Sequence, residues 1–373
     1  MLAAVWVACA GCVAEPESSP PPWWWDGPGA DLAPPAPDDA LGDGSPPTFR
    51  PHAIVAVDAG PEVDLVQVEH WRASAETTPF WSGPAGARLV GSGSVLAVLA
   101  RGPASSLTVG PFASDWDPFT ADLPPDSDPA AFVQGTSCSL VALEGTRTAL
   151  IVGDQQPVFV PLEEHADDDG DPEVASAVRL EERLLVGLQR TSPDGPGDGG
   201  RVVEIDCEGQ VLGVRPLGPG ARLVGPGRPG HVVYVREWAA AGEVLHRFDP
   251  VGASGSGARV LDPPAEGGVL GPVAVIDSGQ VWAVVEDGDE ASLWCYDPFA
   301  EEGAEILTFD APVVDLEVDW MGHLLVLVGG DDPELRIHET EGCVLSDDEP
   351  RRWEVSEDAS DLAAVVRVVT QAE

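Results

Sequence analysis

The chain has 373 residues, of which 43% are hydrophobic, so it holds enough apolar material for one large folded domain or two ordinary ones. Acidic residues outnumber basic residues by 64 to 19, which gives a formal net charge of −45. Such a surface repels a phosphate backbone, and the composition therefore speaks against a nucleic-acid-binding protein. The apolar content also speaks against a chain that is disordered throughout.

An apolar run, MLAAVWVACA, opens the chain and is followed by Gly11 and Cys12. The run is too short to cross a bilayer as a helix. No basic residue precedes it, which indicates that the true start lies upstream. Ala10, Gly11 and Cys12 resemble the last three positions of a bacterial lipoprotein signal, although Cys9 stands where Leu or Val is usual. The resemblance implies an exported protein, lipidated at Cys12 and attached to the membrane by that anchor alone.

The next segment, residues 13–51, is rich in Pro, Asp, Gly and Ser. Such a composition has little apolar surface to bury and favours an extended spacer. We therefore expect residues 1–12 to be a signal segment, residues 13–51 to be a disordered tether, and residues 52–373 to be the folded domain.

Seven short aliphatic and aromatic runs recur along that domain, at 53–57, 95–99, 148–152, 184–188, 231–235, 281–285 and 324–328. They are too short and too rich in β-branched residues for helices, and they are typical of buried strands. A second strand-like segment follows each run and ends at Glu69, Pro111, Glu163, Asp206, Asp249, Asp297 or Glu339, so the repeat is 42–52 residues long. A period in this range with strands only is typical of β-propeller blades.

Residues 271–298 resemble a blade of the NHL or kelch-like propellers, in which a strand ends in Asp, turns at a Gly and re-enters as an apolar strand. The segments 277–280 (DSGQ) and 319–323 (DWMGH) both fit that turn. The resemblance implies architecture only, because propellers serve as enzymes, lectins and scaffolds.

The first repeat begins at a second strand, and the segment 362–369 (LAAVVRVV) looks like a first strand without a blade of its own. We therefore predict an all-β fold with a single propeller of seven four-stranded blades. The C-terminal strand completes the first blade and closes the ring, which protects the sheet edges.

Four cysteines lie in the domain: Cys138, Cys207, Cys295 and Cys343. An even number in an exported chain indicates disulfides, with three alternative connectivities, and free thiols are an equal alternative. The blade assignment places Cys138 at the start of a first strand and favours none of the three pairings.

The long stretch 112–131 carries an aromatic residue between two acids, and we assign it to the crossover from one blade to the next. The turns between second and third strands belong to the same rim, and acids are frequent there. Because loops that carry aromatic residues are common recognition elements, these turns are a candidate binding rim, with ordinary polar turns as the alternative. Its candidate residues are Asp115, Trp116, Asp117, Asp287, Asp289, Asp331 and Asp332.

Metal-binding signals are weak. His52, His231 and His323 each precede the second strand of a blade, but repeat-equivalent residues lie around a ring rather than together. Asp167, Asp169 and Asp171 cluster as calcium ligands do, yet their spacing fails the EF-hand pattern. We therefore expect no cofactor, with calcium at these three acids as the weak alternative.

Motifs of nucleophilic or metal hydrolases and of nucleotide binding are missing from the sequence. The sequence therefore favours a binding scaffold attached to the cell envelope, with a protein or glycan partner, over an enzyme. The alternative is a propeller enzyme that acts on a glycan or small molecule through acids or a divalent cation near the central funnel. The two hypotheses differ in that only the second predicts carboxyl groups that converge on the axis.

Overall fold

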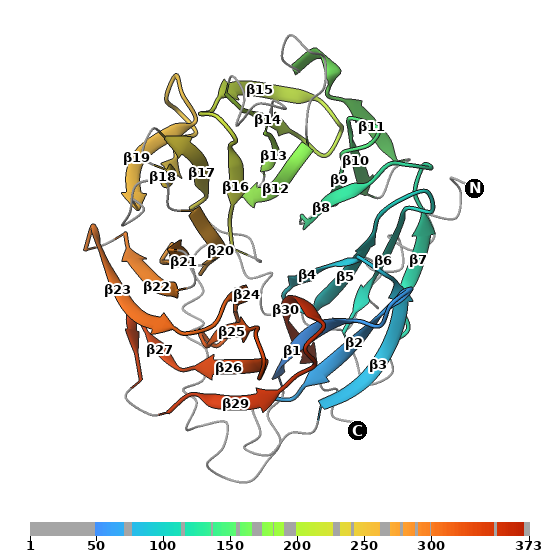
Figure 1. The fold of residues 1–373 in the computed structure, drawn as a ribbon. Helices are drawn as coiled ribbons and strands as arrows, with labels where there is room; N and C mark the ends of the chain where they lie inside the picture. Colours follow the sequence, from blue (N-terminus) through green and yellow to red (C-terminus); the bar gives the residue numbers. More distant parts are fainter. Residues whose placement is uncertain are drawn as a thin grey trace.

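The computed structural model describes residues 49–368 except 71–76, 113–115, 136, 154–156, 166–173, 182, 190–198, 227–231, 240–241, 262–268, 277–278, 288–289, 299 and 347–348. These residues form seven four-stranded antiparallel sheets arranged around a central axis (Figure 1). The protein is a seven-bladed β-propeller, as predicted. The part of the chain that the structure describes holds no helix with the length and hydropathy to cross a membrane.

The strands of blades 1 to 4, from the innermost to the outermost, are as follows. Blade 1 has β30 (Ala359–Val368), β1 (Phe49–Asp58), β2 (Glu62–Val68) and β3 (Thr77–Pro84). Blade 2 has β4 (Arg88–Ser92), β5 (Val95–Ala100), β6 (Ser106–Pro111) and β7 (Phe119–Asp122). Blade 3 has β8 (Pro129–Gln134), β9 (Cys138–Leu143), β10 (Thr148–Gly153) and β11 (Val158–Pro161), followed by the 3-10 turn η2 (Glu163–His165). Blade 4 has β12 (Val174–Leu180), β13 (Arg183–Leu188), β14 (Arg201–Ile205) and β15 (Val211–Pro216).

The remaining three blades have the same order. Blade 5 has β16 (Arg222–Val224), β17 (Tyr234–Ala239), β18 (Gly242–Phe248) and β19 (Ser256–Leu261). Blade 6 has β20 (Val269–Val275), β21 (Val281–Asp287), β22 (Glu290–Asp297) and β23 (Glu302–Phe309). Blade 7 has β24 (Val313–Val318), β25 (Leu324–Val328), β26 (Glu334–His338) and β29 (Arg351–Glu354), with a small hairpin of β27 (Thr340–Glu341) and β28 (Val344–Leu345) between the last two.

The burial pattern explains why the second strands are continuous apolar runs. Every residue of β5 and β25 is buried, because each second strand packs against neighbouring blades on both faces. The outer strands β7, β11 and β29 bury only one residue in four. The apolar core of the ring therefore lies between blades, and each blade depends on its neighbours for stability.

The ring closes as the sequence predicts. β30 pairs with β1 in antiparallel register, from Phe49 opposite Val368 to Val55 opposite Leu362, with a bulge at the far end. Figure 1 shows the red C-terminal strand beside the blue first strand of the ring. β1 begins at Phe49, three residues before the predicted domain boundary.

One blade differs from the predicted register. In blade 3, the run at 148–152 is the third strand β10, and the second strand is β9 (Cys138–Leu143). The segment that ends at Glu163 belongs to the outer strand β11 and to η2. Two buried apolar strands flank the short turn at 144–147, and nothing in their composition tells which is second and which is third.

Because successive strands are antiparallel, the loops alternate between the two faces of the ring. Turns between first and second strands, and between third and fourth strands, lie on one face, which we call the clasp face. Turns between second and third strands, and the connections from one blade to the next, lie on the other, which we call the crossover face.

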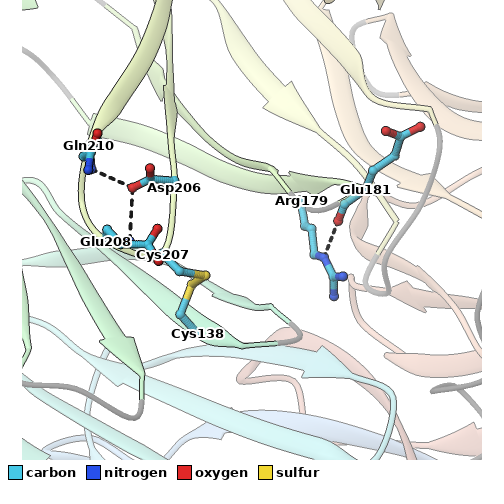
Figure 2. Close-up of a disulfide and its surroundings, with 7 residues drawn as sticks. All are labelled: Cys138, Arg179, Glu181, Asp206, Cys207, Glu208 and Gln210. Atoms are coloured by element: carbon cyan, nitrogen blue, oxygen red, sulfur yellow. Dashed lines mark hydrogen bonds between the residues drawn. A yellow bond between two sulfur atoms is a disulfide. The ribbon is translucent and has the colours of Figure 1, made fainter.

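Two disulfides join neighbouring blades on the clasp face. Cys138 at the start of β9 pairs with Cys207 in the β14–β15 turn, with Cα atoms 5.7 Å apart (Figure 2). Cys295 in β22 pairs with Cys343 between β27 and β28, with Cα atoms 5.4 Å apart. Cys138 therefore begins a second strand rather than a first strand, and this correction follows from the register of blade 3.

Candidate functional site

The innermost strands carry acceptor side chains that bind the edge of the next blade. Asp315 Oδ2 on β24 accepts the backbone N–H of Leu362 on β30 at 2.9 Å. Asp361 Oδ2 on β30 accepts the N–H of Leu89 on β4 at 2.6 Å. Ser176 does the same for Leu223 at the junction of blades 4 and 5. An inner strand has a free edge, and these acceptors satisfy donors that would otherwise be unpaired.

Three carboxyl groups come together on the two inner strands at the seam of the ring. Asp315 and Glu317 lie two residues apart on β24 and so share a face, and Asp361 lies on the neighbouring β30. The carboxyl groups of Asp315 and Asp361 are hydrogen-bonded to each other. Such a bond requires that one of the two keeps its proton.

The environment favours the protonated forms. Burial, followed by the charge of Asp361, raises the pKa of Asp315 well above its ordinary value. Burial and then the charge of Asp361 also raise the pKa of Glu317, to about 8. Burial raises the pKa of Asp361, although hydrogen bonds from Asp315 and from the backbone of Leu89 oppose it. At neutral pH, Glu317 and one member of the aspartate pair therefore carry protons.

Two arginines face the same region from other blades. Arg88 begins β4 and Arg222 begins β16, and both side chains have solvent-accessible surface. The charge of Arg88 acts on both Asp361 and Arg222, and all three residues lie on innermost strands, of blades 2, 1 and 5. Burial, followed by the charges of Arg236 and Arg88, lowers the pKa of Arg222. We call Asp315, Glu317, Asp361, Arg88 and Arg222 the axial charge cluster.

The acidic residues of the cluster have some contact with solvent, although their carboxyl groups are largely desolvated. The three acidic residues retain some solvent-accessible surface, yet protein surrounds their carboxyl groups closely enough to disfavour the ionised forms. Ionisable groups with strongly shifted pKa values are common at functional sites. The cluster offers O–H donors, carboxylate acceptors and guanidinium donors on neighbouring inner strands.

The predicted rim residues are not on one rim. Asp331 and Asp332 are exposed in the β25–β26 turn on the crossover face. Asp287 ends β21 on the same face. Trp116 and Asp117 lie between β6 and β7, the third and fourth strands of blade 2, and so belong to the clasp face. The assignment of 112–131 to a crossover was wrong because it overlooked β7, the outer strand within this stretch.

Trp116 is half-buried in an aromatic cluster between blades 1 and 2. Its ring lies 5.6 Å from that of Phe80 and 5.9 Å from that of Trp81, edge to face. Asp117 beside it is exposed. The remaining candidates, Cys12, Asp115, Asp289, Asp167, Asp169 and Asp171, lie outside the described residues.

A second hollow, of about 340 Å³, opens between blades 4 and 5. Arg247 and Asp249 line it together with apolar residues such as Val233 and Phe248. The Asp249 carboxylate already accepts the N–H groups of its own turn. The axial charge cluster is therefore the stronger candidate, because Asp315 and Asp361 meet in it from different blades and the pKa values of its carboxyl groups are raised.

No protein-family model matches this sequence, and no curated protein matches it. Solved structures do resemble it. The periplasmic gluconolactonase PpgL of Pseudomonas aeruginosa has a TM-score of 0.58 and 13% identity, covering 85% of this chain and 99% of that one. These likenesses show the fold alone.

Two further structures extend the comparison. A protein from Lactobacillus plantarum has a TM-score of 0.57 and 12% identity, covering 86% of this chain and all of that one. Apo AztD from Citrobacter koseri has a TM-score of 0.50 and 15% identity, covering 85% and 98%. Each likeness extends over nearly the whole of the other chain, so the propeller described here corresponds to a complete domain in those proteins.

Proposed function

We propose that this chain is an exported β-propeller that binds a small, hydroxyl-rich molecule at the axial charge cluster. The observation that carries the proposal is that carboxyl groups with raised pKa values and arginines from four blades lie on the innermost strands around the axis. Of the two hypotheses drawn from the sequence, only the one with a small-molecule or glycan site near the central funnel predicts carboxyl groups that converge on the axis.

The charges of the cluster favour an uncharged ligand. Glu317 and one member of the aspartate pair retain protons, so one carboxylate and two arginines leave a net charge of only about +1, and neither a polyanion nor a cation gains much. Sugar hydroxyls both donate and accept, and they match a mixture of O–H, carboxylate and guanidinium groups. The name of the PpgL neighbour, a gluconolactonase, makes a sugar lactone the first probe to try.

The same groups could act on such a ligand. A protonated carboxyl beside an ionised one is the arrangement of general acid and general base. In lactone hydrolysis, the carboxylate of the aspartate pair would take a proton from water, whose oxygen then attacks the carbonyl carbon. Glu317 would give its proton to the ring oxygen as the C–O bond breaks. Binding without turnover leaves the proposal of a binding protein intact.

Export is supported by the two disulfides, because such bonds persist in oxidising compartments. We propose that the anchor is Cys12, with residues 13–51 as the tether. Intact-mass analysis of the protein from its native membranes tests this. A mature N-terminus at another residue, without acyl chains, contradicts it.

The binding test uses isothermal titration of the full chain with glucose, gluconate and freshly dissolved gluconolactone, and a pH-stat assay corrected for spontaneous hydrolysis. Arg88→Gln and Glu317→Ala should each weaken binding about tenfold, as the loss of one good polar contact does. Asp332→Asn, which removes a charge on the crossover face outside the cluster, is the matched control. Equal affinity in all variants, or no binding of any probe, contradicts the proposal.

The pH dependence of stability tests the state of Glu317. Its pKa in the folded protein is raised from 4.5 to about 8, so its protonated form favours folding. That contribution is complete below about pH 4.5 and is lost as the pH rises to about 8. Glu317→Gln cannot ionise and so does not lose this contribution. Its melting temperature relative to that of the wild type should therefore rise from pH 5 to pH 8. A constant difference contradicts the assignment.

A further inference from the structure

Three buried side chains meet where the last blade contacts the first. His70 follows β2 in blade 1, and Asp319 and His323 form the β24–β25 turn of blade 7. Their exposed fractions are 0%, 2% and 5%. His70 Nε2 and His323 Nδ1 each lie 2.8 Å from the same carboxylate oxygen, Asp319 Oδ2. This group lies on the clasp face and shares no residue with the axial charge cluster.

The local turn fixes the carboxylate. Asp319 Oδ1 accepts the backbone N–H groups of Met321 and His323, both at 2.8 Å, and Gly322 supplies the positive φ of 86° that the turn needs. Asp206 makes the same turn with Glu208, Gly209 and Gln210 (Figure 2). In the Asp319 turn, the second oxygen is directed at two imidazoles.

Arg351 contacts the backbone of His70 beside this group. Arg351 Nη1 donates to the backbone oxygen of His70 at 2.5 Å, and its Nη2 lies 3.4 Å from Glu339, which offsets its charge. Among the described residues, His70 Nδ1 has no hydrogen-bond partner. In the metal-free protein, His70 Nε2 donates its proton to the Asp319 carboxylate. Because Nδ1 has no partner that fixes it, the ring can carry its proton on Nδ1 when an ion takes the place of the proton on Nε2.

The geometry points to a metal site. We propose that His70 Nε2, His323 Nδ1 and Asp319 Oδ2 bind a divalent transition ion of the zinc class, which clasps blade 7 to blade 1. Two imidazoles and one carboxylate form a donor set that suits zinc and does not suit calcium or magnesium. The three ligand atoms lie within 4.8 Å of one another. A tetrahedral ion with bonds of about 2.0–2.1 Å needs ligand atoms about 3.3 Å apart, so small side-chain shifts suffice.

The position in the fold supports a structural role. His323 immediately precedes the second strand of blade 7, and Cys138 begins the second strand of blade 3. His70 and Cys207 each follow the acid that ends the third strand of the next blade, Glu69 and Asp206. The cysteine pair at these positions forms a covalent bond between blades. The proposed ion would join the corresponding positions at the seam, where the ring is closed by noncovalent contacts.

The test starts from the full chain with its disulfides intact, dialysed against EDTA and then titrated at high salt, which suppresses weak binding to surface acids. One equivalent of Zn²⁺ should bind in competition with a chromogenic chelator and should raise the melting temperature. Bound Co²⁺ should give a visible spectrum that one equivalent of Zn²⁺ abolishes. X-ray absorption of the zinc-loaded wild type should show two imidazole ligands, a result that needs no variant to fold.

Single substitutions test whether the ion binds at these three residues. His70→Ala and Asp319→Asn should weaken zinc binding about a hundredfold or more, since loss of a supporting contact alone costs 10–100-fold. His165→Ala, at a histidine in η2 on blade 3, should bind as wild type does. No stoichiometric binding, fewer than two imidazoles in the absorption spectrum, or equal affinity in His70→Ala overturns the proposal and leaves a hydrogen-bonded trio only.

Discussion

The junction of blades 3 and 4 and the junction of blades 7 and 1 use equivalent positions for different chemistry. In the first, Cys138 and Cys207 form a disulfide. In the second, His323 and His70 share the oxygen of Asp319. The repeat therefore brings the same two positions of neighbouring blades into contact on the clasp face, and the chemistry of that contact differs from one junction to the next. A third junction, between blades 1 and 2, places His52 against Phe112 there, with ring centroids 5.2 Å apart.

The two junctions also differ in how the chain connects their blades. The chain runs continuously through blades 3 and 4, whereas blade 1 combines strands from both ends of the domain, so the ring closes only through the noncovalent pairing of β30 with β1. Substitutions at the three junctions should show how much stability comes from the clasp and how much from strand pairing.

The largest effect is expected from removing the strand that closes the ring. Truncation after Ser360 deletes most of β30 and leaves β1 without its inner partner. The lost pairing and the exposed core should exceed the total stability of about 5–15 kcal/mol that a domain has. Circular dichroism should show no cooperative melting. Deletion of residues 13–45 is the control and should leave the melt unchanged; a folded truncated chain contradicts the closure argument.

The disulfide at the junction of blades 3 and 4 should rank second. Cys138 and Cys207 are 69 residues apart, and a link across a loop of that length stabilises by about 4 kcal/mol in the chain-entropy estimate. The double substitution to Ser should lower the free energy of unfolding by up to that amount in urea titrations. The same change at Cys295 and Cys343, 48 residues apart, is the matched comparison. A change below about 1 kcal/mol at both would mean that packing alone holds the junctions.

The histidine junction should rank third when no metal is present. Asp319→Asn removes the charge that two buried imidazoles share, and breaking a buried pair costs about 3 kcal/mol. Urea unfolding in EDTA measures the loss. Glu334→Gln, at an ion pair with the partly exposed Arg336, is the control and should cost less than about 1 kcal/mol. Equal losses in the two variants would contradict a special role for the seam.

The aromatic junction should show the smallest effect. Trp116→Ala removes a half-buried indole that contacts Phe80 and Trp81 across blades 1 and 2. Partial burial and two edge-to-face contacts predict a loss of about 2 kcal/mol. Asp117→Asn, at the exposed neighbour, should stay within about 0.5 kcal/mol. If Trp116→Ala also melts like wild type, Trp116 belongs to a contact surface rather than to the ring's packing.

The sequence predicted the architecture because strand burial leaves a strong periodic signal. Second strands such as β5 and β25 are buried on both faces and appear as unbroken apolar runs. The unmatched segment at the C-terminus was enough to predict closure. Blade 3 was misassigned because β9 and β10 are both apolar and flank a short turn, and only tertiary pairing separates them.

Both clusters of charged residues depend on contacts between blades, which the repeat does not encode. Asp315 and Asp361 lie on strands from different blades, and no spacing in the chain brings them together. The 319–323 turn was recognised, but His70 was not, because it lies 249 residues from Asp319. A signal was available: His70 and Cys207 take the same place after the third strand, as do His323 and Cys138 before the second.

The pairing of Ile54 with Ala363 has a consequence for how the protein is made. β1 is among the first parts of the ring to be synthesised, and β30 is the last. Until β30 arrives, β1 presents an unpaired apolar edge that chaperones and proteases can bind. A chain that stops short keeps that edge exposed and can be degraded. The β1 edge is therefore covered only after the residues of β30 have been synthesised.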